Sequence, residues 1–274
     1  MNSHTRPGSW LAVVGAIAAT FVFVAPLVWM FLASFKNIEQ IFSIPPDWIP
    51  DFSYLDNYRK LLSENWPFLV NSIVATLGST ALCLVLALPT AFALVNFRFR
   101  GREFFADWVL STRMMPPIAA GVPLYMIFNS VGLLDTLWAL IIVYAGFNIP
   151  FAVWVAMSFF RRVPKETIEA ALLEGCTWTQ TFFKVALPLT RSGIATVATF
   201  VFIFAWNELL MALFLTTRSA KTFPVVISSF VTTSMTFWEM IAASSVIQAI
   251  PPIIFTLLMQ RHIVSGLTMG AVKD

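Results

Sequence analysis

Long apolar runs separated by short polar segments dominate the pattern along the chain, and the runs hold only isolated charges. A helix of about 20 apolar residues is long enough to cross the hydrocarbon core of a bilayer. The pattern therefore predicts an all-α polytopic membrane protein with six transmembrane helices. The predicted spans are residues 10–35, 67–95, 104–128, 136–160, 192–215 and 239–260.

Composition supports a membrane protein, because 58% of the residues are hydrophobic and only 11% are charged. A soluble domain carries about 25% charged residues. Cys83 lies in an apolar run and Cys176 in a polar segment, so no disulfide is expected. His4 and His262 lie near opposite ends, so no metal site is predicted. The first run exceeds a signal-peptide core of about 7–15 residues, which favours a retained span.

Basic residues predict the orientation, because cytoplasmic segments carry an excess of Lys and Arg. Six spans place both termini on one side. With both termini inside, eleven basic residues are cytoplasmic and five are external, while Arg113 lies within a span. The internal residues are Arg6, Arg98, Arg100, Arg102, Arg161, Arg162, Lys165, Lys184, Arg191, Arg261 and Lys273, and the external ones are Lys36, Arg59, Lys60, Arg218 and Lys221. The sequence therefore predicts an N-in, C-in topology.

One cytoplasmic segment, residues 166–189, is amphipathic where its neighbours are apolar. Pro164 can occupy the first turn of a helix, where its missing N–H costs little. Ile168, Ala171 and Leu172 follow at the spacing of one helical face. An exposed apolar face of this kind is typical of docking to a partner protein. The alternative is that this segment is only a connecting loop that folds on itself.

A second short helix is predicted immediately afterwards. Gly175 suits the end of the first helix, with a positive φ. Thr177 and Gln180 have the spacing of a capping box, and Pro188 is predicted to end the second helix. The apolar positions of this helix are Phe182, Val185 and Ala186. The segment thus has the pattern of a helix–turn–helix.

These residues carry a family resemblance. EAALLEG at 169–175, followed by LP at 187–188, resembles the EAA loop of ABC importer permeases. Further stretches are similar to the carbohydrate-type permeases, the subgroup of the smaller maltose permease subunit. They are SFK at 34–36, PPDW at 45–48, NY at 57–58, MPP at 115–117, PLY at 123–125, WNE at 206–208 and GLTMGAVK at 266–273. Glu174 stands where Asp is frequent, and Cys176–Thr177 where Ala–Ser is frequent.

The resemblance implies a type I ABC importer permease fold in the cytoplasmic (inner) membrane of a bacterium. It implies a second homologous permease subunit, two ATP-binding subunits that hold ATP and Mg²⁺, and an extracytoplasmic solute-binding protein. The transported solute would be a sugar, an oligosaccharide or a polyol. The expected organisation is a first span with its external loop, 1–66, and a permease core, 67–274, whose coupling loop covers about 161–191.

The resemblance also implies roles for individual residues. The ATPase-docking residues would be Glu169, Ala170, Ala171, Gly175, Leu187 and Pro188. The tail residues Gly270, Ala271, Val272 and Lys273 would reach the ATPase interface, and a frayed terminus is the alternative.

The rest of the sequence limits the functions that this chain can have. It contains no GxxxxGK[ST] motif, so it binds no ATP through a P-loop, and no cofactor is expected in this chain. No Ser/His/Asp set, metal cluster or paired intramembrane acids indicate an enzyme. The basic stretch at 98–103 is too short to indicate nucleic-acid binding. Two alternatives remain open: an ABC permease for another solute class, or a secondary transporter that uses Arg113, Glu208 or Glu239.

Polar residues within spans are candidates for the substrate path, because exposure to lipid would cost free energy. Trp206 could stack on a sugar face, and Asn207 could hydrogen-bond to hydroxyls. Glu208 and Asn148 are further candidates. Hydrogen bonding between helices is the alternative role for each polar residue. Pairs of prolines at 116–117 and 251–252 are expected to break or kink the third and sixth spans.

Overall fold

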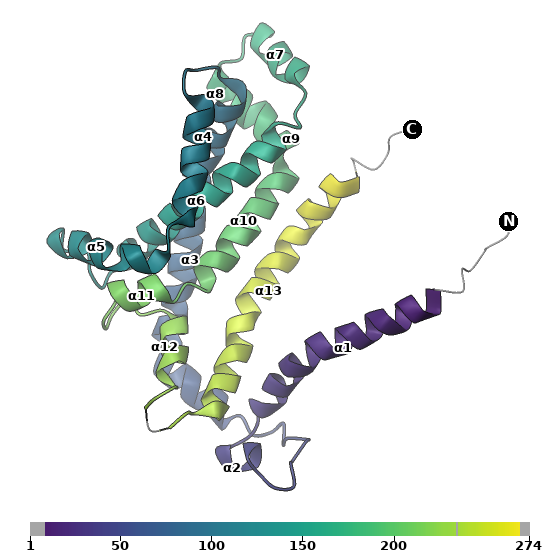
Figure 1. The fold of residues 1–274 in the computed structure, drawn as a ribbon, viewed down its shortest axis with the longest axis vertical. Coiled ribbons are helices and arrows are strands. Elements are labelled where there is room, and N and C mark those ends of the chain that lie inside the picture. The colour runs from purple at the N-terminus through teal and green to yellow at the C-terminus, as the bar shows by residue number, and fades with distance from the viewer. Residues whose placement is uncertain (1–8, 234, 269–274) are drawn as a thin grey trace, which may run out of the picture. The chain divides into compact units, whose positions relative to one another are not determined.

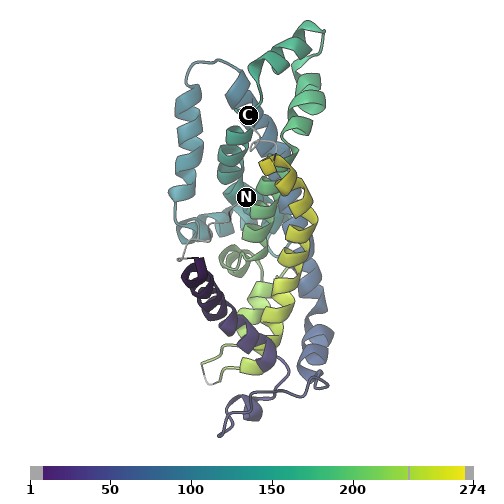
Figure 2. The ribbon, with the colours of Figure 1, turned by 90° about the vertical axis from the view of Figure 1, so that its right-hand side faces the viewer.

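The computed structural model describes residues 9–233 and 235–268, and these form helices with no β-strand (Figures 1 and 2). The α-helices are α1 (Ser9–Ala33), α2 (Ile38–Ile41), α3 (Asp56–Asn96), α4 (Arg102–Ser111), α5 (Pro117–Ser130), α6 (Leu137–Phe160), α7 (Lys165–Leu173), α8 (Trp178–Thr181), α9 (Leu187–Leu189), α10 (Arg191–Trp206), α11 (Leu210–Leu215), α12 (Phe223–Ser229) and α13 (Trp238–Thr268). A 3₁₀ turn, η1 (Thr112–Met114), and a π-helix, η2 (Phe182–Ala186), complete the set. The all-helical prediction is confirmed.

Four of the described helices are long and apolar enough to cross a membrane. They are Ala12–Ala33, Asp56–Asn96, Leu137–Phe160 and Trp238–Gln260. A fifth is reached if Trp178–Leu189 and Arg191–Trp206, which meet at a bend of 82°, count as one span. Four of the six predicted spans thus correspond to continuous helices, and the other two, 104–128 and 192–215, are interrupted.

The interruption of 104–128 follows from its two prolines. Met115 has ψ 125° and Pro116 has ψ 125°, so both are extended, and α5 begins at Pro117. Residues that precede proline avoid the helical region, which explains why α4 cannot continue into α5. The expected break at Pro251 and Pro252 is absent, because α13 continues through both prolines as one helix. The break in 192–215 falls at residues 207–209, between α10 and α11.

The chain divides into two compact units, residues 1–66 with 227–249, and residues 67–226 with 250–274. In the first unit, buried Asn57 donates hydrogen bonds to the carbonyl oxygens of Ser34 and Lys36, both at 2.9 Å. The Ser34 hydroxyl lies 2.6 Å from the hydroxyl of Tyr58. The SFK and NY stretches therefore meet in space, where they fix the end of α1 against the start of α3.

In the second unit, α6 packs along α10 and α5 packs beside α11 (Figure 1). The approach of α10 to α6 depends on Gly193, because a Cβ at this position would overlap the ring of Phe159. Gly146 on α6 offers a contrast, since a Cβ there would meet no atom within 4 Å. Small residues let helix backbones approach closely in membrane proteins.

A carboxylate joins two connections of the same unit. Asp135, with φ 56°, accepts backbone N–H bonds from Thr217, Arg218, Ser219 and Ala220, at 2.8–3.1 Å. Burial acts to raise the pKa of Asp135, but these four donors outweigh it and hold the pKa well below its usual range. The α5–α6 connection is therefore fixed to the segment that follows α11.

We expect Gly193→Ala to lower the melting temperature of the purified chain and Gly146→Ala to leave it unchanged or raise it. Alanine favours a helix over glycine by about 1 kcal/mol at both positions, whereas overpacking costs about 1–3 kcal/mol at Gly193 alone. Thermal unfolding in detergent measures the difference. A Gly193→Ala variant at least as stable as Gly146→Ala would contradict the close packing of α10 on α6.

We expect Asp135→Asn to lower the melting temperature, because the amide keeps one acceptor oxygen and presents N–H groups to N–H groups. The depressed pKa means that the charged form stabilises the fold above the ordinary pKa of 3.8, and that this stability is lost as pH falls through the folded-state pKa. The difference between variant and wild type should therefore stay constant from about pH 5 to pH 8. A difference that disappears within this range, or an equal effect of the control Asp107→Asn, would refute the role of the carboxylate.

Candidate functional site

The polar segment at 166–189 forms the predicted helix–turn–helix. The first helix is α7, and Pro164 precedes it at the N-cap rather than within its first turn. Gly175 has φ 90°, which confirms the predicted left-handed turn. Thr177 and Gln180 form the predicted capping box, with the Gln180 N–H 3.2 Å from the Thr177 hydroxyl and the Thr177 N–H 2.9 Å from the Gln180 side-chain oxygen.

The prediction that Pro188 ends the second helix is wrong. The helical path runs from α8 through the π-helix η2 into α9, and Thr190 caps its end. Pro188 lies in the first turn of α9. Leu187, the residue before the proline, keeps helical angles of φ −62° and ψ −47°, so the helix continues past Pro188 to Leu189.

The apolar face of α7 is turned toward the chain's own core. Ile168 and Ala171 are buried, and Leu172 is half-buried in the same core as Ile168. The prediction of an exposed apolar face at these positions is therefore wrong, because this face supports the loop from within. Leu173, by contrast, is 90% exposed.

An aromatic cluster fixes this loop to two long helices. It consists of Phe92 and Phe97 at the end of α3, Phe160 at the end of α6, Trp178 of α8, and Phe182. The ring of Trp178 lies 4.6 Å from that of Phe97, and Phe182 lies 5.2 Å from Phe92, measured between centroids. Phe160 lies 5.7 Å from Phe92. Because aromatic pairs at these separations attract each other beyond simple burial, they hold the loop against the ends of α3 and α6.

The proposed docking residues divide between the surface and the interior. Glu169, Ala170, Gly175 and Pro188 are exposed, whereas Ala171 is buried and Leu187 is half-buried against the core. The tail positions Gly270, Ala271, Val272 and Lys273 lie outside the described residues. Leu173 is not among the predicted docking residues; it follows Leu172 in the sequence and lies one turn after Glu169 and Ala170.

Two of the candidate path residues are buried, and a third is exposed. Trp206 is only 1% exposed, and its ring stacks on Phe202, which stacks in turn on Phe255, so Trp206 is not accessible to a sugar. Asn148 is buried and donates to the Tyr144 carbonyl at 2.8 Å. Asn207 remains exposed at the end of α10.

Glu208 has a structural partner of its own. A side-chain oxygen of Glu208 accepts the backbone N–H of Met211 at 2.9 Å, and Met211 lies in the first turn of α11. The WNE stretch thus supplies a core tryptophan, an exposed amide and a carboxylate that caps the next helix.

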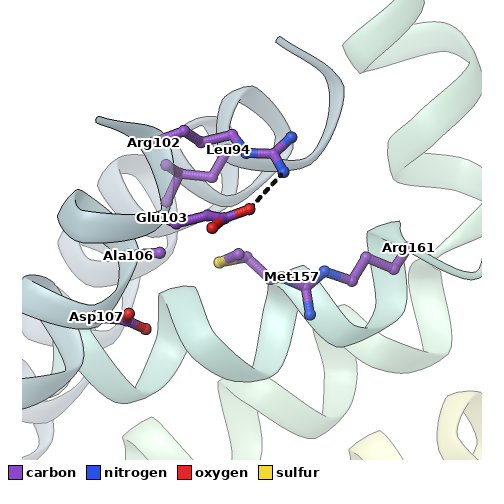
Figure 3. A pocket seen from close by; sticks show the side chains of 7 residues that line it. All are labelled: Leu94, Arg102, Glu103, Ala106, Asp107, Met157 and Arg161. Atoms are coloured by element: carbon purple, nitrogen blue, oxygen red, sulfur yellow. Dashed lines mark ion pairs between the residues drawn. The ribbon is translucent and has the colours of Figure 1, made fainter. Parts of the chain in front are cut away.

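A separate polar cavity of about 280 Å³ lies between α4 and α6 (Figure 3). Its charged lining residues are Arg102, Glu103, Asp107 and Arg161, and Arg102 pairs with Glu103 at 3.8 Å. Charges of both signs balance in this cavity. The described part of the chain also holds no group of three or more His, Cys, Asp or Glu side chains arranged to bind a metal.

Comparison with known families shows to which family this chain belongs. A profile of the family described as binding-protein-dependent transport system inner membrane component matches residues 83–269. The chain belongs to this family. This permease is therefore a transport subunit of an ABC importer in the inner membrane, and it works with ATPase and binding-protein partners.

Individual relatives resemble the permease over almost its whole length. It is 38% identical to the trehalose transport system permease protein SugB of Mycobacterium tuberculosis, over 98% of each chain. It is 34% identical to the diacetylchitobiose uptake system permease protein DasC of Streptomyces coelicolor, over 95% of each chain. Its fold is similar to a chain of a bacterial ABC transporter involved in alginate import, with a TM-score of 0.77, 22% identity and coverage of 95% of this chain and 99% of the other.

Proposed function

We propose that this permease imports a saccharide. The relatives named for trehalose and diacetylchitobiose both transport saccharides. The polar, exposed Asn207 next to exposed aromatic side chains suits a saccharide, which combines hydroxyl groups with apolar ring faces. A permease for another solute class is the second candidate.

Six membrane crossings, with both termini in the cytoplasm, fit this function. In this topology α4 with α5, and α10 with α11, each count as one interrupted crossing beside α1, α3, α6 and α13. The excess of basic residues in the segments assigned to the cytoplasm supports the orientation. The loop that contains α7 and α8 is then cytoplasmic.

The proposed coupling role rests on the residues that are exposed on the outer surface of α7. Glu169, Ala170 and Leu173 are exposed there, while the aromatic cluster supports the loop from behind. An exposed leucine beside an exposed glutamate and alanine suits insertion into a groove of a partner protein. The partner is an ATPase subunit, and two such subunits bind the ATP and Mg²⁺ that drive transport.

The complete importer contains a second homologous permease subunit and an extracytoplasmic solute-binding protein. In this assembly the tail residues 270–273 extend toward the ATPase interface. Force from ATP-driven closure enters at α7 and passes through the aromatic cluster to α3 and α6.

We expect Leu173→Ala to leave the melting temperature of the permease unchanged but to reduce retention of the ATPase by about 30-fold, because removing an interface hot spot costs roughly 2 kcal/mol. Ile168→Ala should instead lower the melting temperature, since Ile168 is buried in the permease itself. Co-purification and thermal unfolding measure the two effects. Val131→Ala, an exposed position in the α5–α6 connection, is the control. Undiminished ATPase retention by Leu173→Ala would refute the docking role.

We expect the solute-binding protein encoded with this permease to bind a saccharide. Thermal shift of the purified binding protein, against neutral disaccharides, acidic sugars, amino acids and peptides, measures the preference. A rise in melting temperature with saccharides alone is the expected result, because a ligand that binds only the folded state stabilises it. Stabilisation by amino acids or peptides alone would favour the second candidate.

A further inference from the structure

Arg113 lies against a pair of contacting aromatic rings, Phe151 and Phe204, at the interruption of the third predicted span. It belongs to the 3₁₀ turn η1, between α4 and α5. Its guanidinium carbon lies 4.9 Å from the ring centroids of both Phe151, on α6, and Phe204, on α10. Cation–π attraction of this kind holds the guanidinium in place. It leaves the N–H groups of Arg113 available for hydrogen bonds.

No acid neutralises this arginine within the described residues. The side-chain ion pairs found there are Arg59 with Asp56 and Arg102 with Glu103. The Arg113 side chain also donates no hydrogen bond to another described residue. A guanidinium carries five N–H donors and stays charged in proteins, so an exposed Arg113 has donors available for another molecule.

Lipid is not the most favourable contact for Arg113. A cation near the middle of a span is expensive against hydrocarbon, so it faces protein or a water-filled path. Phe200, Phe204 and Asn207 lie along one side of α10, at the spacing i, i+4, i+7. Phe200 is 45% exposed and Phe204 is 37% exposed, and Asn207 is exposed as well. An amide on this stripe is also better placed against water than against lipid.

We propose that Arg113, Phe204 and Asn207 form a saccharide subsite in the translocation path. The guanidinium fork binds a pair of neighbouring oxygens of the sugar, which are either two vicinal hydroxyls or a carboxylate. The exposed surface of the Phe200–Phe204 pair, whose centroids lie 6.1 Å apart, contacts the apolar face of the sugar ring. This subsite rests on the proposed import of a saccharide, and it names the residues that would contact it.

The first test asks whether the charge of Arg113 is sensed at position 207, three residues after Phe204, and it needs no sugar. Asn207→Cys is introduced with Cys83→Ala and Cys176→Ser, and the importer is assembled with its partner subunits in nanodiscs. The rates of modification by the anionic reagent sulfonatoethyl methanethiosulfonate and the cationic reagent trimethylammonioethyl methanethiosulfonate are measured. Adding Arg113→Gln should lower the anionic-to-cationic rate ratio about tenfold, because the local potential of the cation is lost.

The control for this experiment is Arg98→Gln, an exposed arginine in the α3–α4 connection, which should leave the ratio unchanged. An unchanged ratio in Arg113→Gln would overturn the proposal, and so would a position 207 that reacts with neither reagent. Loss of the second permease subunit from the Arg113→Gln complex would also overturn it, since Arg113 would then pair with that subunit.

Protection is measured at Met114→Cys, an exposed position beside Arg113 that leaves Asn207 intact, in the same Cys83→Ala and Cys176→Ser background. Protection of this cysteine from the cationic reagent distinguishes vicinal hydroxyls from a carboxylate as the bound oxygen pair. A pool of trehalose, maltose and diacetylchitobiose should slow modification if the subsite takes vicinal hydroxyls. A pool of glucuronate and galacturonate alone should slow it if a carboxylate is required. Protection by neither pool would overturn the saccharide subsite. Failure of the proposed function is distinct: the binding protein would then reject saccharides, while the charge-dependent rate ratio at position 207 would persist.

Discussion

The packing of Trp178 and Phe182 against Phe92, Phe97 and Phe160 is the interaction on which the account of coupling depends. In the proposed function, α7 would transmit force only if its loop moves together with the helices to which it is attached. Here the rings lie 4.6–5.7 Å apart between Trp178 and Phe97, Phe182 and Phe92, and Phe160 and Phe92. The loop is thereby joined to the ends of α3 and α6 through side chains, in addition to its covalent connections. Its second helix also continues through the π-helix into α9, which leads directly to α10.

In the second unit, polar side chains lie where the two predicted spans are interrupted. Prolines 116 and 117 separate α4 from α5, and the intervening turn places Arg113 against rings from α6 and α10. In the fifth predicted span, the interruption exposes Asn207 and leaves Glu208 to cap α11. Continuous helices would present mostly apolar side chains at these depths. The interruptions therefore expose polar groups within two otherwise apolar predicted spans.

Much of this could be predicted from the sequence, because several rules are local. The capping box at Thr177 and the left-handed Gly175 depend on neighbouring backbone geometry, and both are confirmed. The side to which α7 turns its apolar face could not be predicted, since periodicity shows that Ile168 and Leu172 share a face but not what covers it. The burial of Trp206 could not be predicted for a similar reason: its ring stacks on Phe202, which stacks in turn on Phe255, a ring far away in the sequence. Proline likewise broke one predicted span and was accommodated in α13, because tertiary packing decides between these outcomes.

The central claim is that the outer surface of α7 contacts an ATPase subunit, and site-specific photo-crosslinking tests it most directly. Benzoylphenylalanine would replace Leu173 in the assembled, transport-competent importer, and replacement of exposed Gly146 on α6 would serve as the reference. The account predicts a light-dependent adduct between position 173 and the ATPase, and no ATPase adduct from position 146. An intact importer in which position 173 yields lipid adducts, or no ATPase adduct, would contradict it.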